Sequence, residues 1–137
     1  MRIAFAADHA GFALKQRLIE HARGQGHEIL DLGTHSLDSV DYPDFGAACA
    51  RAVVGGRADR GVCVCGTGIG IGISANKVPG CRAATCHDHY TAQMARRHND
   101  ANVLALGSRV IGEGNAVDAL EAFLATEFEG GRHATRV

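Results

Sequence analysis

The chain has 137 residues, a length that suits one folded domain with its own core. With 46% hydrophobic and 21% charged residues, its composition is that of a globular protein rather than a disordered or fibrous one. A net charge of −1 with neutral histidines excludes a broad basic surface for nucleic acid or for an anionic membrane. A charged ligand must therefore be bound by a local group of residues.

The sequence contains no run of about 18 apolar residues and no signal-peptide pattern, so we expect a cytoplasmic protein without a membrane partner. Its five cysteines form no C-x-x-C pair, and free thiols are expected in a reducing compartment. Cys63 and Cys65 stand two apart in a predicted strand. We expect their side chains on opposite faces, one toward a site and one toward the core.

Short apolar runs alternate along the chain with stretches of helical periodicity. The predicted strands are residues 3–7, 28–32, 61–65, 82–85 and 102–106. The predicted helices are residues 12–23, 44–54, a third that opens after residue 70, 88–97 and 115–128. This alternation predicts parallel strands joined by right-handed crossovers, and hence a Rossmann-like three-layer α/β/α sandwich forming one domain over residues 1–137.

In such folds, ligands bind beyond the carboxyl ends of the strands. Polar residues gather at those points: Asp8-His9 after the first strand, Cys65-Gly66-Thr67 after the third, His87-Asp88-His89 after the fourth and Gly107-Ser108-Arg109 after the fifth. We therefore expect the functional residues there.

The glycine-rich turn at residues 66–72 is the strongest local motif, because its alternating glycines let the backbone approach a ligand closely. The dinucleotide fingerprint would need a glycine in place of Ile71 or Ile73. A nucleotide P-loop would need a Gly-Lys-Ser/Thr ending, and a cysteine phosphatase would need an arginine closing the loop. None of these three motifs fits.

What remains is Cys65 at the junction of a strand and a helix N-terminus, where the helix dipole and the loop amides favour a thiolate. Such a thiolate can act as a base, and the amides can hold an anion. The plainer alternative, a small buried cysteine like Cys63, stays open.

His98 shares one face of its predicted helix with Tyr90 and Met94. It is a candidate acid–base residue if a reacting group lies within hydrogen-bond reach, and otherwise an ordinary core or surface histidine. His87 and His89 could suggest a metal, but alternate residues seldom supply a full set of ligands. We expect no metal site.

The last residues, 129–137, form a basic tail hinged at Gly130-Gly131. Arg132 and Arg136 could bind a phosphate dianion together with His9 and Arg109, which would make the tail a phosphate-binding arm. A solvated basic tail is the alternative. Because no aromatic residues are interleaved with the basic ones, a nucleic-acid partner is not expected.

Several motifs occur in a fixed order from Arg2 to Val137: Asp8-His9-Ala10-Gly11, Asp41-Tyr42-Pro43-Asp44, Cys65-Gly66-Thr67-Gly68-Ile69-Gly70, Ser74-Ala75-Asn76-Lys77, Asn99-Asp100-Ala101-Asn102-Val103-Leu104, Gly107-Ser108-Arg109 and Glu129-Gly130-Gly131-Arg132-His133. Together they resemble the ribose-5-phosphate isomerase B family, which also includes the galactose-6-phosphate isomerase subunits. A branch of that family has a glutamate at the position of Ile71 and lacks the cysteine. The chain therefore resembles the thiol branch.

The resemblance implies an intramolecular oxidoreductase that interconverts D-ribose 5-phosphate and D-ribulose 5-phosphate through a cis-enediolate. By position, Cys65 is the base that moves the proton between C2 and C1, and His98 opens the sugar ring with Asp8 and Thr67 nearby. The implied substrate-binding residues are Asp8, His9, Gly66, Thr67, Gly68, Ile69, Gly70, Asn99, Arg109, Arg132 and Arg136.

The resemblance further implies a five-stranded parallel sheet, no cofactor, a small sugar phosphate as substrate, and a homodimer whose active site is shared between subunits. Association to a tetramer stays open, as does the subunit that supplies each residue. Two alternatives to the pentose reaction remain: an isomerase of a hexose 6-phosphate such as allose or galactose 6-phosphate, and a non-catalytic subunit that binds a sugar phosphate.

Overall fold

Five short strands form one sheet in which every neighbouring pair runs parallel, in the order β2-β1-β3-β5-β4. The computed structural model describes residues 1–137. The strands are β1 (Arg2–Ala7), β2 (Glu28–Asp31), β3 (Arg60–Cys65), β4 (Ala83–Thr85) and β5 (Val103–Gly107). The helices are α1 (Phe12–Gly24), α2 (Tyr42–Val54), α3 (Ile69–Asn76), α4 (His89–Asn99), α5 (Glu113–Ala125) and α6 (Arg132–Arg136).

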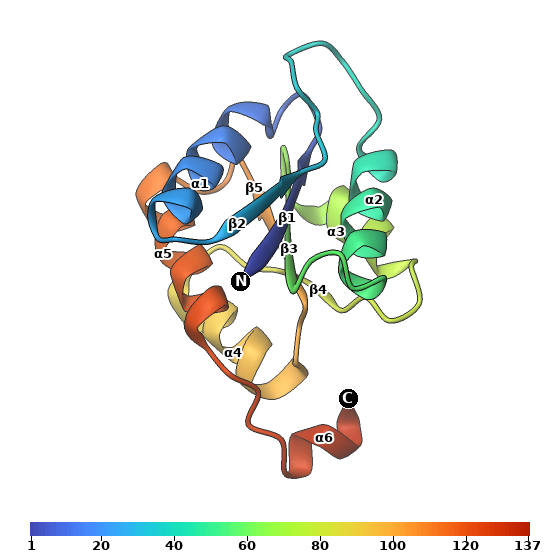
Figure 1. Cartoon of the computed structure of the whole chain (residues 1–137), viewed down its shortest axis with the longest axis vertical. Coiled ribbons are helices and arrows are strands. Elements are labelled where there is room, and N and C mark those ends of the chain that lie inside the picture. Colours follow the sequence, from blue (N-terminus) through green and yellow to red (C-terminus); the bar gives the residue numbers. More distant parts are fainter.

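Helices cover both faces of the sheet, with α1, α4 and α5 on one side and α2 and α3 on the other (Figure 1). Side chains alternate between these faces along each central strand. In β1, for example, Ile3 and Phe5 belong to the core beneath α1 and α5, whereas Ala4 and Ala6 belong to the core beneath α2. The predicted three-layer α/β fold with five parallel strands is confirmed.

The expectation that Cys63 and Cys65 face opposite sides was wrong. Both belong to the core on the α2 and α3 side, because residues two apart in a strand share a face. All five cysteines are free, as predicted. A hydrogen bond with Cys49 and burial hold the pKa of Cys63 well above its usual value, and burial raises the pKa of Cys81 to about 11. Both groups are therefore kept as thiols.

The packing of α3 depends on one close approach between helices. A Cβ atom on Gly46 of α2 would lie 2.1 Å from Oγ of Ser74 and 2.6 Å from the carbonyl oxygen of Ile71. Only glycine fits at that position, so α2 fixes where α3 lies.

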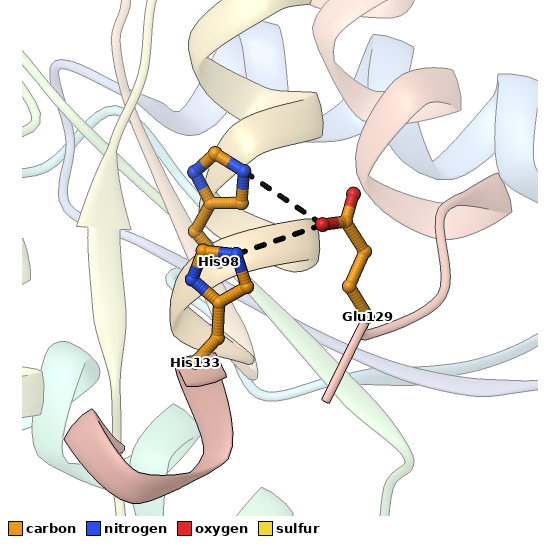
Figure 2. Close-up of side chains that lie close together, drawn as sticks. All are labelled: His98, Glu129 and His133. Carbon is orange, nitrogen blue, oxygen red and sulfur yellow. Dashed lines mark ion pairs between the residues drawn. The ribbon is translucent and has the colours of Figure 1, made fainter. Parts of the chain in front are cut away.

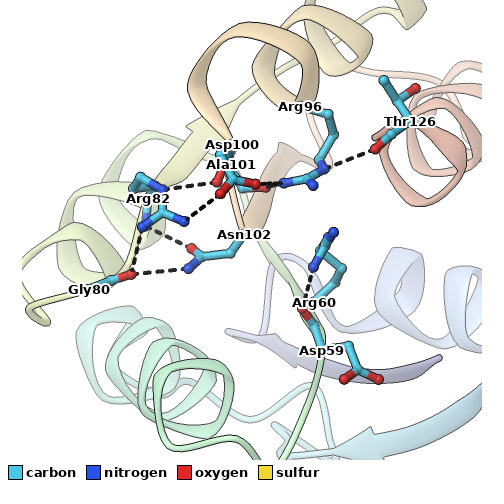
Figure 3. Close-up of polar contacts among 9 residues, drawn as sticks. All are labelled: Asp59, Arg60, Gly80, Arg82, Arg96, Asp100, Ala101, Asn102 and Thr126. Carbon is cyan, nitrogen blue, oxygen red and sulfur yellow. Dashed lines mark hydrogen bonds and ion pairs between the residues drawn. The ribbon is translucent and has the colours of Figure 1, made fainter. Parts of the chain in front are cut away.

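The fifth helix ends at Ala125 rather than at the predicted residue 128. Thr126 leaves the helix because its carbonyl accepts a hydrogen bond at 3.1 Å from Nε of the buried Arg96 (Figure 3). Its hydroxyl donates to the carbonyl of Ala122 at 2.6 Å. This contact with α4 is tertiary, so helical periodicity did not reveal it.

The polar network of Figure 3 also fixes the end of α4. Nη1 of Arg96 donates to Asp100 at 2.8 Å and to the carbonyl of Ala101 at 2.6 Å. Arg82 donates through Nε to the carbonyl of Asp100 at 2.9 Å, and Asp100 takes a left-handed conformation with φ of 46°. The last turn of α4, which carries His98, is therefore held rigidly.

The C-terminal tail folds back as the short helix α6, which the sequence did not predict. Gly130 and Gly131 have φ angles of 68° and 56°, which reverse the chain before α6. His133, a residue of α6, is buried against the end of α4. None of the helices is both long enough and apolar enough to cross a membrane.

Candidate active site

The turn after β3 places the Cys65 thiol at the N-terminus of α3. Gly68 takes a left-handed conformation with φ of 78°, and its N–H donates to Sγ of Cys65 at 3.1 Å. Cys65 is 5% exposed. Because a thiolate accepts hydrogen bonds better than a thiol does, a donor and a helix N-terminus at this sulfur suit a cysteine that works as a base.

Several backbone amides of this turn have no partner within the protein. The N–H of Ile69 donates to Oγ1 of Thr67 at 3.2 Å. The N–H groups of Gly66, Thr67 and Gly70 donate to no protein atom. The turn can therefore offer these three donors to an anionic oxygen held beside the thiol.

Arg109 lies against the same turn. Its N–H donates to the carbonyl of Gly66 at 3.0 Å, and the N–H of Ser108 donates to the carbonyl of Cys65 at 2.8 Å. Nη1 of Arg109 lies 3.2 Å from where a Cβ atom on Gly66 would be. The segment that follows β5 thus sets the guanidinium of Arg109 against Gly66.

Asp8 and His9 follow β1 at this edge of the sheet. Asp8 is buried, and its Oδ1 accepts the N–H of Gly11 at 3.0 Å. Nδ1 of His9 accepts the N–H of Val40 at 3.2 Å, so in the neutral ring the proton lies on Nε2, where it can be donated to an anion.

His98 and Asn99 lie at the opposite edge of the sheet. Cys65 pairs with Gly107 at the carboxyl end of β5, whereas α4 runs back and ends at Asn99, just before β5 begins at Val103. The strand between those two edges covers about 13 Å. Figure 1 likewise shows α6 beyond the end of the sheet at which β1 begins.

The predicted site residues therefore fall into two groups, and one chain does not bring the two together. The Cys65 group, at the carboxyl edge, contains Asp8, His9, Cys65, Gly66, Thr67, Gly68, Ile69, Gly70 and Arg109. The His98 group, at the amino edge, contains His98, Asn99, Arg132 and Arg136. Asn99 and Arg136 line a cavity of 430 Å³ beside β4.

Glu129 and His133 join the His98 group, although the sequence motifs did not assign them a role. The imidazoles of His98 and His133 stack with ring centroids 4.3 Å apart and planes 11° apart. One oxygen of Glu129 lies 3.6 Å from Nε2 of His133 and 4.0 Å from Nε2 of His98 (Figure 2). Glu129 and His133 are four residues apart, a spacing that brings side chains together within a helix. The sequence did not predict a helix there, because Gly130 and Gly131 lie between them.

This trio presents three ligand atoms within 4.8 Å of one another. Parallel stacked imidazoles direct their Nε2 lone pairs side by side rather than toward a common point, so the arrangement suits a shared proton better than a metal ion. His87 and His89 do not converge either. His87 accepts the N–H of Gly107 at 3.0 Å, and His89 pairs with Asp118 at 3.0 Å.

The fold and the Cys65 turn define a doubly wound α/β protein with a thiol and free amides at the ligand-binding edge of its sheet. The sequence model of the Ribose/Galactose Isomerase family matches residues 3–137. The chain therefore belongs to the ribose/galactose isomerase family of enzymes, as the sequence motifs indicated.

Individual relatives agree with this membership. The chain is 48% identical to ribose-5-phosphate isomerase B of Escherichia coli over 136 residues, which cover 99% of this chain and 91% of that protein. The structure of ribose-5-phosphate isomerase B from Clostridium thermocellum is 54% identical, with a TM-score of 0.99 over 100% of this chain and 93% of the other. The enzyme from Mycoplasma genitalium with bound ribulose-5-phosphate is 40% identical, with a TM-score of 0.94 over 98% and 90% of the two chains.

Proposed function

We propose that this protein interconverts D-ribose 5-phosphate and D-ribulose 5-phosphate through a cis-enediolate. The observation that carries the proposal is the Cys65 turn, where a thiol at a helix N-terminus lies beside unpaired backbone amides. The similarity to ribose-5-phosphate isomerases, one of them solved with ribulose-5-phosphate, supplies the sugar phosphate. Five free cysteines favour a cytoplasmic protein.

The first step opens the furanose ring of the aldose. His98 donates a proton to O4 as the C1–O4 bond breaks, and Asp8 accepts the proton of O1 as the C1=O1 bond forms. Thr67 belongs to the Cys65 turn, and its hydroxyl lies next to the opened aldehyde. A positioned acid of this kind typically contributes about 10²- to 10⁴-fold in rate.

The second step moves a proton along the open chain. The Cys65 thiolate removes the proton from C2, and the electron pair of that C–H bond forms the enediolate with negative charge on O1. The amides of Gly66, Thr67 and Gly70 stabilise this charge, each by about 3 kcal/mol in the transition state. A proton then moves from O2 to O1 across the cis-enediolate, which places the negative charge on O2. The C2=O2 bond forms as Cys65 returns its proton to C1, while Asn99 holds the sugar hydroxyls.

The phosphate binds at a distance from the reacting carbons. His9 and Arg109 supply donors from the Cys65 group, and Arg132 and Arg136 supply guanidiniums from α6. Because the phosphate does not react, its binding energy serves to place C1 and C2 against the thiol.

A complete site needs two chains, and we propose a homodimer in which the Cys65 group of one subunit faces the His98 group of the other. The separation of about 13 Å along β5 supports this arrangement. Ile69 and Ile73 on α3 are 58% and 56% exposed, next to the Cys65 turn, which offers apolar surface for a partner. A two-fold axis then creates two equivalent sites.

Replacing the thiol tests the proposed base. Cys65→Ala should lower kcat for ribose 5-phosphate by at least about 10³-fold, because no other group at the turn can remove the C2 proton. Binding of a sugar phosphate should persist, since the phosphate donors lie elsewhere. Cys49→Ala, which alters a buried cysteine of α2, serves as the matched control and should keep its activity. Unchanged turnover in Cys65→Ala would refute the base.

Substrate length separates the pentose reaction from its alternatives. We expect kcat/KM for ribose 5-phosphate to exceed the values for allose 6-phosphate and galactose 6-phosphate. A higher value for either hexose would assign the site to that sugar instead. Binding of these sugar phosphates without turnover of any of them would indicate a non-catalytic subunit.

A further inference from the structure

Glu129 stands between α5 and α6 with one carboxylate oxygen facing two imidazoles (Figure 2). That oxygen, Oε1, is 3.6 Å from Nε2 of His133 and 4.0 Å from Nε2 of His98. Both distances allow an ion pair with whichever ring carries an extra proton. The two rings come from different helices, His98 from α4 and His133 from α6, and both face the same oxygen of Glu129.

The backbone and the second oxygen of Glu129 are already engaged. Its N–H donates to the carbonyl of Arg97 at 3.1 Å, and Oε2 lies 3.9 Å from Nε of Arg97. Both contacts tie Glu129 to the last turn of α4, which also carries His98. The carboxylate is therefore held in place relative to His98, with Oε1 left for the histidines.

His133 closes one face of the His98 ring. Its side chain is only 9% exposed and lies parallel to His98, so water cannot reach His98 from that side. Burial, with the nearby charges of His98 and Arg132, lowers the pKa of His133. A positive charge on His98 would also repel one on His133, whose ring lies parallel to it.

We propose that Glu129 is a positioning residue for ring opening: its carboxylate holds the imidazole of His98 in the orientation from which that ring donates a proton to O4. His133, on the neighbouring element α6, stacks on the His98 ring and so limits its rotation. Glu129 itself need not touch the sugar. This inference rests on the proposed function, because it concerns the step that frees the aldehyde before Cys65 acts.

A substrate that cannot form a ring separates ring opening from proton transfer. The 4-deoxy analogue of ribose 5-phosphate lacks the hydroxyl that closes the furanose, yet it keeps the distance between the carbonyl and the phosphate. Glu129→Gln should lower kcat/KM for ribose 5-phosphate at least about tenfold, because a poorly oriented His98 would lose part of the rate enhancement that a general acid provides. Its kcat/KM for the analogue should stay within about twofold of the wild-type value.

Two further variants complete the experiment. Glu127→Gln alters an exposed carboxylate in the same segment that forms no ion pair, and it should match the wild type on both substrates. Glu129→Asp keeps the charge on a shorter side chain and should recover part of the activity on ribose 5-phosphate. Retained turnover of the analogue would itself show that Glu129→Gln is folded.

Three other outcomes would each contradict either this inference or the proposed function. An equal loss on both substrates would mean that Glu129 only docks α6 and its arginines, and it would overturn the inference. Unchanged activity of Glu129→Gln on both substrates would also overturn it. A wild-type protein that does not convert ribose 5-phosphate would instead contradict the proposed function.

Discussion

At the scale of single residues, the conformation of Gly68 decides which donor faces the Cys65 sulfur. Its φ of 78° turns its own N–H onto the sulfur and starts α3. A Cβ atom there would lie 2.9 Å from the carbonyl carbon of Leu106 and 3.1 Å from the nitrogen of Gly107. Both are backbone atoms of β5, which cannot move aside without disturbing the sheet.

Gly68→Ala should therefore lower both stability and activity. The left-handed conformation alone costs about 1–2 kcal/mol for a residue with a side chain, and relief of the clash would move the amide away from Cys65. Urea unfolding and kcat/KM measured on the same preparation would show both losses. Gly114→Ala is the control, because nothing lies within 4 Å of its added methyl group. A Gly68→Ala variant that matched this control would contradict the role given to the turn.

The residues of the Cys65 group could be predicted from the sequence, because polar residues that follow parallel strands must share one edge of the sheet. The contact of Glu129 and His133 with His98 could not be predicted in this way. It depends on two left-handed glycines that reverse the chain and on the way α6 then packs.

At the scale of helices and strands, periodicity located five strands and five helices, since each buries an apolar face against the sheet. It missed α6, whose five residues are too few to show a period. It also extended the fifth helix too far, because the hydrogen bond from Arg96 to Thr126 is made across elements. Local pattern thus predicted the layers, and tertiary contacts decided where the last elements end.

The docking of α6 should depend on pH through His133. The charged and titratable groups that face it are His98 from α4, Glu129 before α6, and Arg132 and Arg136 on α6 itself. Burial, followed by the cations, lowers its pKa from the usual value of 6.5. The native state therefore binds this proton less readily than the unfolded chain does. The contribution of His133 to the free energy of unfolding is therefore fully present above pH 6.5. It is lost as the pH falls through the lower pKa that His133 has in the native state.

Urea midpoints measured above and below this range should fall on acidification in the wild type, and they should fall less in His133→Gln. His35→Gln removes a histidine whose side chain is 71% exposed and should keep the wild-type dependence. The same pH dependence in His133→Gln and in the wild type would exclude a contribution from His133.

At the scale of the whole molecule, the fold divides the site. The chain places the proposed base, the turn with its free amides and Arg109 at one edge of the sheet, and the proposed acid with two arginines at the other. The family resemblance implied a site shared between subunits. Which site residues lie at the same edge of the sheet depends on the direction in which α4 and the tail run relative to the strands. In the proposed homodimer, each site takes the Cys65 group from one chain and the His98 group from the other.

Mixing two inactive variants tests whether Cys65 and His98 of one site come from different chains. Cys65→Ala and His98→Asn should each be inactive alone. When they are unfolded together in equal amounts and refolded, about half of the dimers contain one chain of each kind, and each mixed dimer has one intact site. The mixture should therefore regain about a quarter of the wild-type activity. If Cys65 and His98 worked within one chain, no chain in the mixture would be complete, and a failure to recover activity would contradict the shared site.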